Sequence, residues 1–392
     1  MNFEWMTPGR IIFGRGSIGR AGRLAVEFGR RILLVRDGGL AADSGPVEAV
    51  YAALAGERLE VEEAVVRGEP AVEAVDELVA RVRSFEPEAV CGLGGGSAID
   101  AAKAVSALLV NGGEVLDYLE VIGRGRPFSM PGIPVLAIPT TAGTGAEATR
   151  NAVLTSRAYK VKASLRGAGL MPRLALVDPA LTDSLPPAIT ASTGLDALTQ
   201  CLESYLCLKA NPATDALALE GMKRASRSLL PAFRGGDVAE ARDDMALAAL
   251  LSGLCLTNAG LGAVHGLAAA LGGLFPVPHG AACGLLLPHV LSANIRALAA
   301  QSTSHPVLVK CRRLDDILVP ECEGLEGVKT VLCIDRLLEM TAKMGIPRLS
   351  SYGIKDSDLP ALAAAAARTG SIKGNPVVLP EPVLVDILRA AL

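Results

Sequence analysis

The residues best suited to metal chemistry lie in the second half of the sequence. Asp196 and Gln200 are four positions apart in a helical pattern, so their side chains share one helix face. His265 and His279 follow on later segments. A carboxylate, an amide oxygen and imidazoles that converge between helices would suit Fe²⁺ or Zn²⁺. Such a metal acts as a Lewis acid toward a substrate carbonyl. Taken alone, either histidine is more often a core residue or a helix cap.

Two glycine-rich loops compete as phosphate-binding sites. Residues 14–19 match GxGxxG literally and follow a strand-like run, and Asp37 ends the next such run, where a dinucleotide site places its ribose-binding acid. Residues 94–97, Gly-Gly-Gly-Ser, leave an apolar run and enter an Ala-rich helix. By motif alone the first loop would be the dinucleotide site, while in the second loop the N–H groups at a helix start favour phosphate binding over a bare glycine-rich turn. A tight turn, or an N-cap in the case of Ser97, is the structural alternative.

The elements that would position these residues differ between the two halves of the chain. Up to residue 186, β-branched runs alternate with helical patterns, which predicts an α/β domain with a parallel sheet over 1–186. Helical patterns alone predict an all-α domain over 187–392. Residues 301–327 show no clear pattern. The predicted strands are 10–13, 31–35, 59–66, 89–92, 135–138 and 174–177, and the predicted helices of the first half are 19–28, 47–55, 71–85 and 98–109.

Composition narrows the functional classes. The 392 residues are 50% hydrophobic and 20% charged, with a net charge of -3, which gives no reason to expect nucleic acid or an anionic membrane as partner. Eight cysteines without a CxxC pair, and no visible signal peptide, predict a reducing, cytoplasmic location. Residues 246–275 carry no charge, but polar residues interrupt them, so we expect two buried helices and no membrane span.

Taken in order, these motifs and others resemble the iron-containing (group III) alcohol dehydrogenases. The resemblance implies a dehydroquinate synthase-like fold with an N-terminal NAD-binding domain and a C-terminal metal and substrate domain. It also implies a homodimer, and it places the pyrophosphate on the second loop, so that 14–19 becomes a structural turn. The matching segments are 94–103 (GGGSAIDAAK), 138–147 (IPTTAGTGAE), 193–199 (TGLDALT), 262–266 (GAVHG), 278–280 (PHG) and 374–376 (GNP).

The resemblance assigns cofactor positions residue by residue. Asp37 matches the acid that holds the adenosine ribose, which favours NAD(H) over NADP(H), although the adjacent Arg36 could pair with a 2′-phosphate. The other implied cofactor-binding residues are Gly94, Gly95, Gly96, Ser97, Asp100, Thr140, Thr141, Thr144, Asn151 and Lys162.

The implied metal site departs from the family pattern of one Asp and three His. Asp196, His265 and His279 match, but Gln200 stands at a histidine position, and Ala269 replaces a histidine that many members carry near the substrate. Three interpretations follow. The metal binds regardless, with the Gln200 oxygen as a possible ligand; or the enzyme is a metal-independent reductase of the maleylacetate reductase type; or the protein binds nucleotide without catalysis.

We therefore expect an NAD(H)-dependent oxidoreductase that interconverts a small alcohol and its aldehyde or ketone, assisted by a divalent metal. A lyase like dehydroquinate synthase shares the superfamily, but the apolar surroundings of His265 argue against a polar, metal-rich lyase pocket. His289 is expected to be structural, and His305 receives no role.

Overall fold

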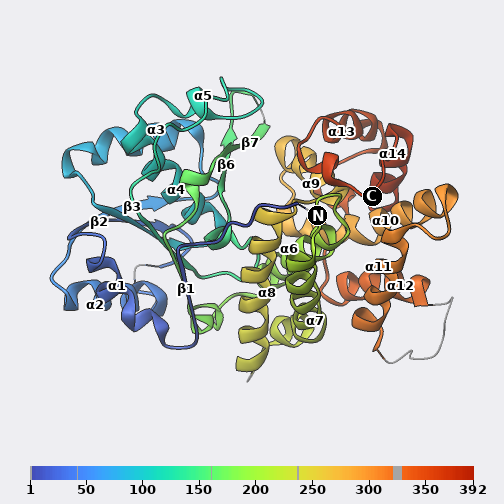
Figure 1. The fold of residues 1–392 in the computed structure, drawn as a ribbon, viewed down its shortest axis with the longest axis horizontal. Coiled ribbons are helices and arrows are strands. Elements are labelled where there is room, and N and C mark those ends of the chain that lie inside the picture. Colours follow the sequence, from blue (N-terminus) through green and yellow to red (C-terminus); the bar gives the residue numbers. More distant parts are fainter. Residues whose placement is uncertain (1, 42, 160, 236–237, 321–328) are drawn as a thin grey trace. The chain divides into compact units, whose positions relative to one another are not determined.

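The chain forms two compact units, each described here by itself (Figure 1). The computed structural model describes residues 2–41, 43–159, 161–235, 238–320 and 329–392. The first unit is Met6–Leu185 and the second is Pro186–Leu392. Residues 2–5 group with the second unit, whereas the sequence interpretation had placed them in the first domain. Part of the unclear region, 321–327, lies outside the described residues.

The first unit is built on a six-stranded sheet in which every pair of neighbouring strands is parallel, as predicted. Its order is β1-β8-β5-β4-β2-β3. All six predicted strands are present, but β2 and β4 each run two residues further than predicted. The strands are β1 (Arg10–Phe13), β2 (Arg31–Asp37), β3 (Glu60–Val66), β4 (Ala89–Gly94), β5 (Val135–Pro139) and β8 (Leu174–Val177).

Helices cover both faces of this sheet (Figure 1). Alternate residues of a strand point to opposite faces, and β2 shows this clearly. Leu33 and Val35 pack with one helical layer, while Ile32 and Leu34 pack with the other. The first layer holds α3 (Val72–Val82), α4 (Gly96–Asn111) and α5 (Val115–Tyr118), and the second holds α1 (Ala21–Val26) and α2 (Gly45–Gly56).

One feature of the first unit was missed: an antiparallel hairpin of β6 (Asn151–Ser156) and β7 (Val161–Arg166). Its buried positions alternate with exposed or half-buried ones, as in a strand with one face on the core. In β6 the exposed Val153 stands between the buried Ala152 and Leu154, so apolar residues do not mark the buried face alone.

Strand order places a binding edge at the carboxyl ends of β2 and β4. From β2 the chain moves outward to β3, returns to β4, and then proceeds the other way to β5 and β8. The direction of winding therefore reverses between β2 and β4. Open parallel sheets bind ligands at such switch points, outside the carboxyl ends of the strands.

All the secondary-structure elements described in the second unit are helices, as predicted. The uncharged stretch 246–275 forms parts of two helices that bend by 100° at a short break. The long helices are α6 (Pro187–Leu206), α7 (Pro212–Arg234), α8 (Ala239–Asn258), α9 (Ala263–Leu274), α10 (His279–Gln301), α11 (Pro306–Leu318) and α12 (Lys329–Lys343), followed by α13 (Leu359–Ala366) and α14 (Glu381–Ala390).

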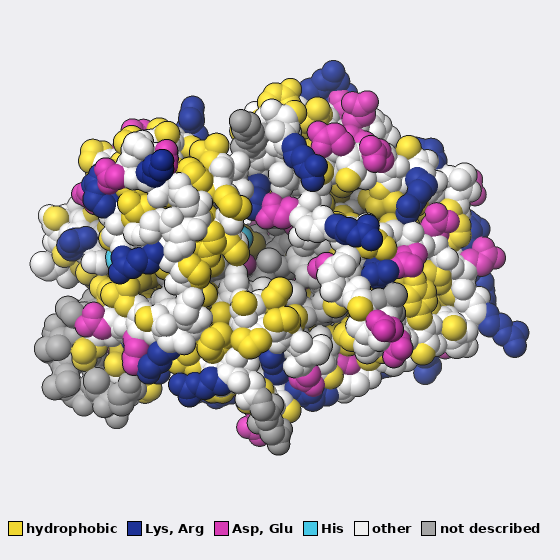
Figure 2. All heavy atoms as spheres, turned by 180° about the vertical axis from the view of Figure 1, so that it is seen from behind, with side chains coloured by type: hydrophobic (Ala, Val, Ile, Leu, Met, Phe, Trp, Pro, Cys, Tyr) yellow, Lys and Arg dark blue, Asp and Glu magenta, His cyan; other side chains and the backbone are white. Residues whose placement is uncertain are grey.

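Helix α10 is long and apolar enough to cross a membrane, but 67% of its most apolar window is buried inside the protein. This is what a core helix shows, since burial against protein replaces the lipid that a spanning helix would face. Figure 2 shows that acidic and basic side chains are interspersed on the face in view and do not gather into one single-sign patch.

Candidate active site

Three of the four predicted metal ligands converge in the helical unit. The Asp196 Oδ1 atom lies 3.2 Å from Nε2 of His265 and 3.8 Å from Nε2 of His279. A fourth residue, Cys283, joins them, and one potential ligand atom from each of the four lies within 4.8 Å of the others. Asp196 and His265 are almost fully buried, while His279 is partly exposed.

Three helices, α6, α9 and α10, supply the four residues of this cluster. Asp196 lies in the middle of α6, which is buried along most of its length. His265 is the third residue of α9, and His279 is the first residue of α10. Cys283 follows His279 by four positions, so one face of α10 carries both.

Glu203 holds the His265 ring from behind. Its Oε2 lies 2.6 Å from Nδ1 of His265, and both oxygens also accept the backbone N–H groups of Val264 and His265. When a histidine donates Nδ1–H to a carboxylate, the lone pair of Nε2 is free to bind a metal. Sequence analysis missed Glu203, because a helical pattern does not reveal which acid faces a distant helix start.

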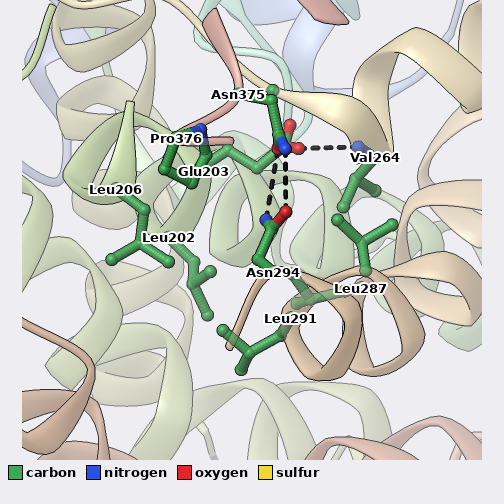
Figure 3. Close-up of a pocket in the computed structure, with 11 residues that line it drawn as sticks. Leu202, Glu203, Leu206, Val264, Leu287, Leu291, Asn294, Asn375 and Pro376 are labelled. Carbon is green, nitrogen blue, oxygen red and sulfur yellow. Dashed lines mark hydrogen bonds between the residues drawn. The ribbon is translucent and has the colours of Figure 1, made fainter. Parts of the chain in front are cut away.

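Asn375 supports the start of α9 as well, and Figure 3 shows its amide paired with that of Asn294. Asn375 Oδ1 accepts the N–H of Ala263, and the Asn375 and Asn294 amides bond each other in both directions. The cavity beside Glu203 and Asn375 has a volume of only about 10 Å³, which is room for at most one water. The cavity is therefore too small for a substrate, and the residues that line it, Glu203 and Asn375, support the cluster.

Burial disfavours charge at every member of the cluster, and mutual interactions oppose that effect. The pKa of His265 is raised well above its ordinary value, because the Cys283 charge and hydrogen bonds with Asp196 and Glu203 outweigh burial. The pKa of Asp196 is lowered by the two histidines and a Gln200 hydrogen bond against the effect of burial. The pKa of the Cys283 thiol is likewise lowered by both imidazoles.

Gln200, the fourth predicted ligand, and the two other histidines lie in different surroundings. Gln200 is buried and its side chain hydrogen-bonds Asp196, so it acts on a neighbouring carboxylate. His289 lies further along α10 and is half-buried. His305 is the N-cap of α11, where its Nδ1 accepts the N–H of Val307. Ala269 is half-buried on α9, four residues after His265.

The structure brings the predicted pyrophosphate loop and Asp37 together in the first unit. The loop ends β4, and α4 begins at Gly96 with Gly95 as its N-cap, so the alternative that Ser97 caps this helix is wrong. Gly94 has a φ of +147°, and a Cβ there would lie 2.6 Å from the Asp37 Cβ. Only glycine permits this approach.

Two of the predicted threonines line the same loop. A Cβ on Gly95 would lie 3.4 Å from Thr141 Oγ1, and one on Gly96 would lie 2.9 Å from Thr144 Oγ1. Thr140 is buried, and its N–H donates to the Gly94 carbonyl. The loop, Asp37 and these threonines thus gather at the carboxyl ends of β2, β4 and β5, where the strand order predicts a ligand.

Arg36 has partners in the protein. Its Nε forms an ion pair with Glu63, and its Nη1 donates to the Leu40 carbonyl. Asp37 Oδ1 accepts the N–H of Gly39. A guanidinium held by Glu63 is less available to a 2′-phosphate than a free one.

The other predicted cofactor residues lie less directly at the loop. Asp100 is buried, accepts the N–H of Val153 and pairs with Lys103, so it links α4 to β6. Lys162 lies on β7 opposite Thr155 of β6, and its ammonium group forms an ion pair with Glu69. Asn151 shares that face of the hairpin but lies about 13 Å along it. Their roles as cofactor residues stay predictions.

In the competing GxGxxG loop, residues 14–19, a backbone N–H group already donates to a carboxylate of the protein, that of Asp178. The N–H of Ile18, at the start of a short 3-10 helix over Ser17–Arg20, donates to Asp178 Oδ2 at 3.0 Å. Asp178 is 1% exposed. A buried carboxylate at this position repels a phosphate, which agrees with a structural turn.

Comparisons with known proteins agree with this architecture. The family model for iron-containing alcohol dehydrogenase matches residues 8–179, and the model for the Fe-containing alcohol dehydrogenase family, C-terminal, matches residues 190–392. The chain is 38% identical to alcohol dehydrogenase 4 of Saccharomyces cerevisiae over 305 residues, 78% of this chain and 76% of that protein.

Solved structures of two relatives share the whole fold. A 1,3-propanediol oxidoreductase superposes with a TM-score of 0.92 at 32% identity, with all of both chains covered. A sulfoacetaldehyde reductase from Bifidobacterium kashiwanohense in complex with NAD⁺ gives 0.85 at 27% identity, covering 100% of this chain and 99% of that one. The protein belongs to the iron-containing alcohol dehydrogenase family and is an oxidoreductase with a dehydroquinate synthase-like fold.

Proposed function

We propose that the protein interconverts a small alcohol and its aldehyde or ketone with NAD(H), assisted by a divalent metal at Asp196, His265 and His279. The observation that carries the proposal is the position of the His265 ring between two carboxylates. A neutral imidazole has one N–H, which Glu203 receives at Nδ1. Either a proton or a metal ion must therefore lie between Nε2 and the Asp196 oxygen, and we propose that a divalent metal takes this place.

The donor set fits such a metal in type and in arrangement. Carboxylate and imidazole donors suit both Fe²⁺ and Zn²⁺, and an outer carboxylate on a histidine ligand is the usual support of a metal site. When bound, the metal supplies a Lewis acid that polarises the substrate carbonyl. Asp196 would offset its charge, while Glu203 would hold His265 in the ligating tautomer. Gln200 would support Asp196 through its amide N–H.

The first unit fits NAD(H) for separate reasons. The bare backbone of Gly94–Gly96 and the start of α4 offer N–H groups to a pyrophosphate. The Asp37 carboxylate, beside Gly94, would accept hydrogen bonds from the ribose hydroxyls and repel a 2′-phosphate. The nicotinamide, when bound, supplies the hydride acceptor or donor. With Ala269 in place of a histidine, we propose that solvent or a ribose hydroxyl exchanges the proton.

A turnover assay tests this function. NADH formation would be followed with ethanol, 1-propanol and 1,3-propanediol, for the wild type and for Asp196→Ala. Asp386→Ala, which alters an exposed carboxylate on α14, is the matched control. We expect turnover by the wild type and the control, and at least 100-fold less by Asp196→Ala. Unimpaired turnover by Asp196→Ala would favour a metal-independent reductase, and NAD binding without turnover in the wild type would favour a silent binder.

We also propose a cytoplasmic homodimer. Family membership supports the dimer, and the seven described cysteines support a reducing compartment, since all are buried free thiols. Sedimentation analysis at micromolar concentration would show a single species of twice the 40.3 kDa chain mass. A monomer at all concentrations would contradict this.

A further inference from the structure

The metal cluster contains a thiol that the established family pattern does not explain. Cys283 Sγ lies 3.8 Å from Nε2 of His265 and 3.8 Å from Nε2 of His279. It is fully buried, and it follows His279 by four positions, so both side chains leave α10 on the same face. The other six described cysteines are not members of the cluster.

The spacing of these atoms matches that of a metal coordination shell. A tetrahedral zinc ion with Zn–S of about 2.3 Å and Zn–N of about 2.0–2.1 Å separates sulfur and nitrogen ligands by about 3.6 Å, and nitrogen and oxygen ligands by about 3.4 Å. The observed separations are 3.8 Å for both sulfur–nitrogen pairs, and 3.2 and 3.8 Å for Asp196 with the two histidines. These four pairs lie within a few tenths of an ångström of the expected separations, and the other two pairs of ligand atoms lie within 4.8 Å.

Gln200 and Cys283 both depart from the family pattern of one Asp and three His, and the second departure compensates for the first. The Gln200 amide N–H donates to Asp196, and its neutral amide oxygen is a weaker metal ligand than the imidazole that the resemblance assigns to this position. Cys283 returns the number of charged or imidazole donors around the centre to four. Its thiolate would add a second negative charge to that of Asp196, which together neutralise a divalent ion.

We propose that the Cys283 thiolate is the fourth protein ligand of the metal, and that this N₂OS set makes the site one for Zn²⁺ in preference to Fe²⁺. Thiolate is a soft ligand, and geometry and ligand type decide selectivity among these ions. Binding would displace the thiol proton to solvent, as metal binding to cysteine requires. The inference rests on the metal site of the proposed function.

Cobalt substitution of the full-length protein tests this. Co²⁺ bound by a thiolate gives a near-ultraviolet charge-transfer band that nitrogen and oxygen ligands do not give. We expect this band in the wild type and in Cys201→Ser, which alters an equally buried thiol on α6 of the same unit. We expect its loss in Cys283→Ser, together with a fall in Zn²⁺ affinity of at least the tenfold to hundredfold seen for outer-shell partners.

The outcomes separate this inference from the proposed function. Co²⁺ binding by the wild type without the charge-transfer band would overturn the role of Cys283 and leave the metal site intact. No binding of Co²⁺ or Zn²⁺ in equilibrium dialysis would overturn both. The wild-type spectrum decides the question even if Cys283→Ser does not fold.

Discussion

Glu203 shows how much of a metal site lies outside its ligands. One carboxylate holds the His265 ring and two backbone N–H groups at the start of α9. It therefore fixes both the position of the helix and the tautomer of its histidine. We expect Glu203 to position the site without touching the substrate.

Glu203→Gln tests that role. The glutamine oxygen can still accept a backbone N–H, but it cannot serve both Val264 and the His265 ring as the carboxylate does. We predict a 10–100-fold loss of metal affinity, measured by competition with a chelator. Glu220→Gln, on the surface of α7, is the control. Equal affinities in the two variants would show that Glu203 does not orient His265.

Asp37 is predicted to select the cofactor. Asp37→Ala removes an ionised acceptor of hydrogen bonds, each worth about 1.5–3 kcal/mol, so NADH should bind roughly 10- to 100-fold more weakly. NADPH should lose less or gain, because the repulsion of its 2′-phosphate is removed. Fluorescence titration with both cofactors measures this, with the exposed Asp43→Ala as control. An unchanged ratio of the two affinities would remove Asp37 from the ribose site.

Among the elements, the two glycine-rich loops invite a paired test. A Cβ on Gly95 would meet Thr141 only at ordinary contact distance, and a Cβ on Gly19 would meet nothing within 4 Å, so both alanine variants should fold. Gly95→Ala places a methyl group on the backbone that we assign to the pyrophosphate. We predict at least a tenfold loss of NADH affinity for Gly95→Ala and none for Gly19→Ala. The reverse result would restore the Gly14–Gly19 loop as the cofactor site.

A buried acid beside α4 predicts a pH dependence of stability. Burial raises the pKa of Glu147 to about 7 from a reference of 4.5, although Lys103 and a backbone hydrogen bond oppose this. As the pH rises, Glu147 ionises at a lower pH in the unfolded chain than in the folded protein. The folding stability of the wild type therefore falls between pH 4.5 and 7 and stays at the lower value above pH 7. The difference corresponds to about 3 kcal/mol as an upper bound.

Glu147→Gln removes this titration. Relative to the wild type, the variant should be more stable at pH 8 than at pH 5 by up to about 3 kcal/mol, as measured by urea denaturation. Glu48→Gln, at an exposed position in α2, should show no such trend. A Glu147→Gln effect that is the same at both pH values would contradict the raised pKa.

The same elements show what sequence could predict. Strands such as β1 and β8 were located because short apolar runs stand between turn residues. The hairpin of β6 and β7 was missed, since Ala152, Val153 and Leu154 are consecutive apolar residues and hide the alternation of burial. Cys283 lies four positions after His279, so helical spacing could have found it, but only the convergence of α6, α9 and α10 shows that it joins Asp196. No sequence pattern around Glu203 indicates that it contacts His265, which lies 62 residues further along the chain.

At the scale of the whole molecule, the two units carry different halves of the chemistry. The cofactor loop lies in Met6–Leu185, and the metal cluster lies in Pro186–Leu392. Substitutions in one half should therefore leave ligand binding by the other intact. Asp196→Ala should keep its NADH affinity, and Gly95→Ala should keep its metal affinity, which allows loss of a ligand to be separated from loss of the fold.

The central claim is that turnover requires the metal. The most direct test is to strip the anoxically purified protein with a chelator, count its metal by mass spectrometry, and follow NADH oxidation by an aldehyde as Zn²⁺ or Fe²⁺ is returned. We predict no turnover by the stripped protein, and recovery in proportion to bound metal up to one ion per chain. Full turnover by the stripped protein would contradict the claim and identify a metal-independent reductase.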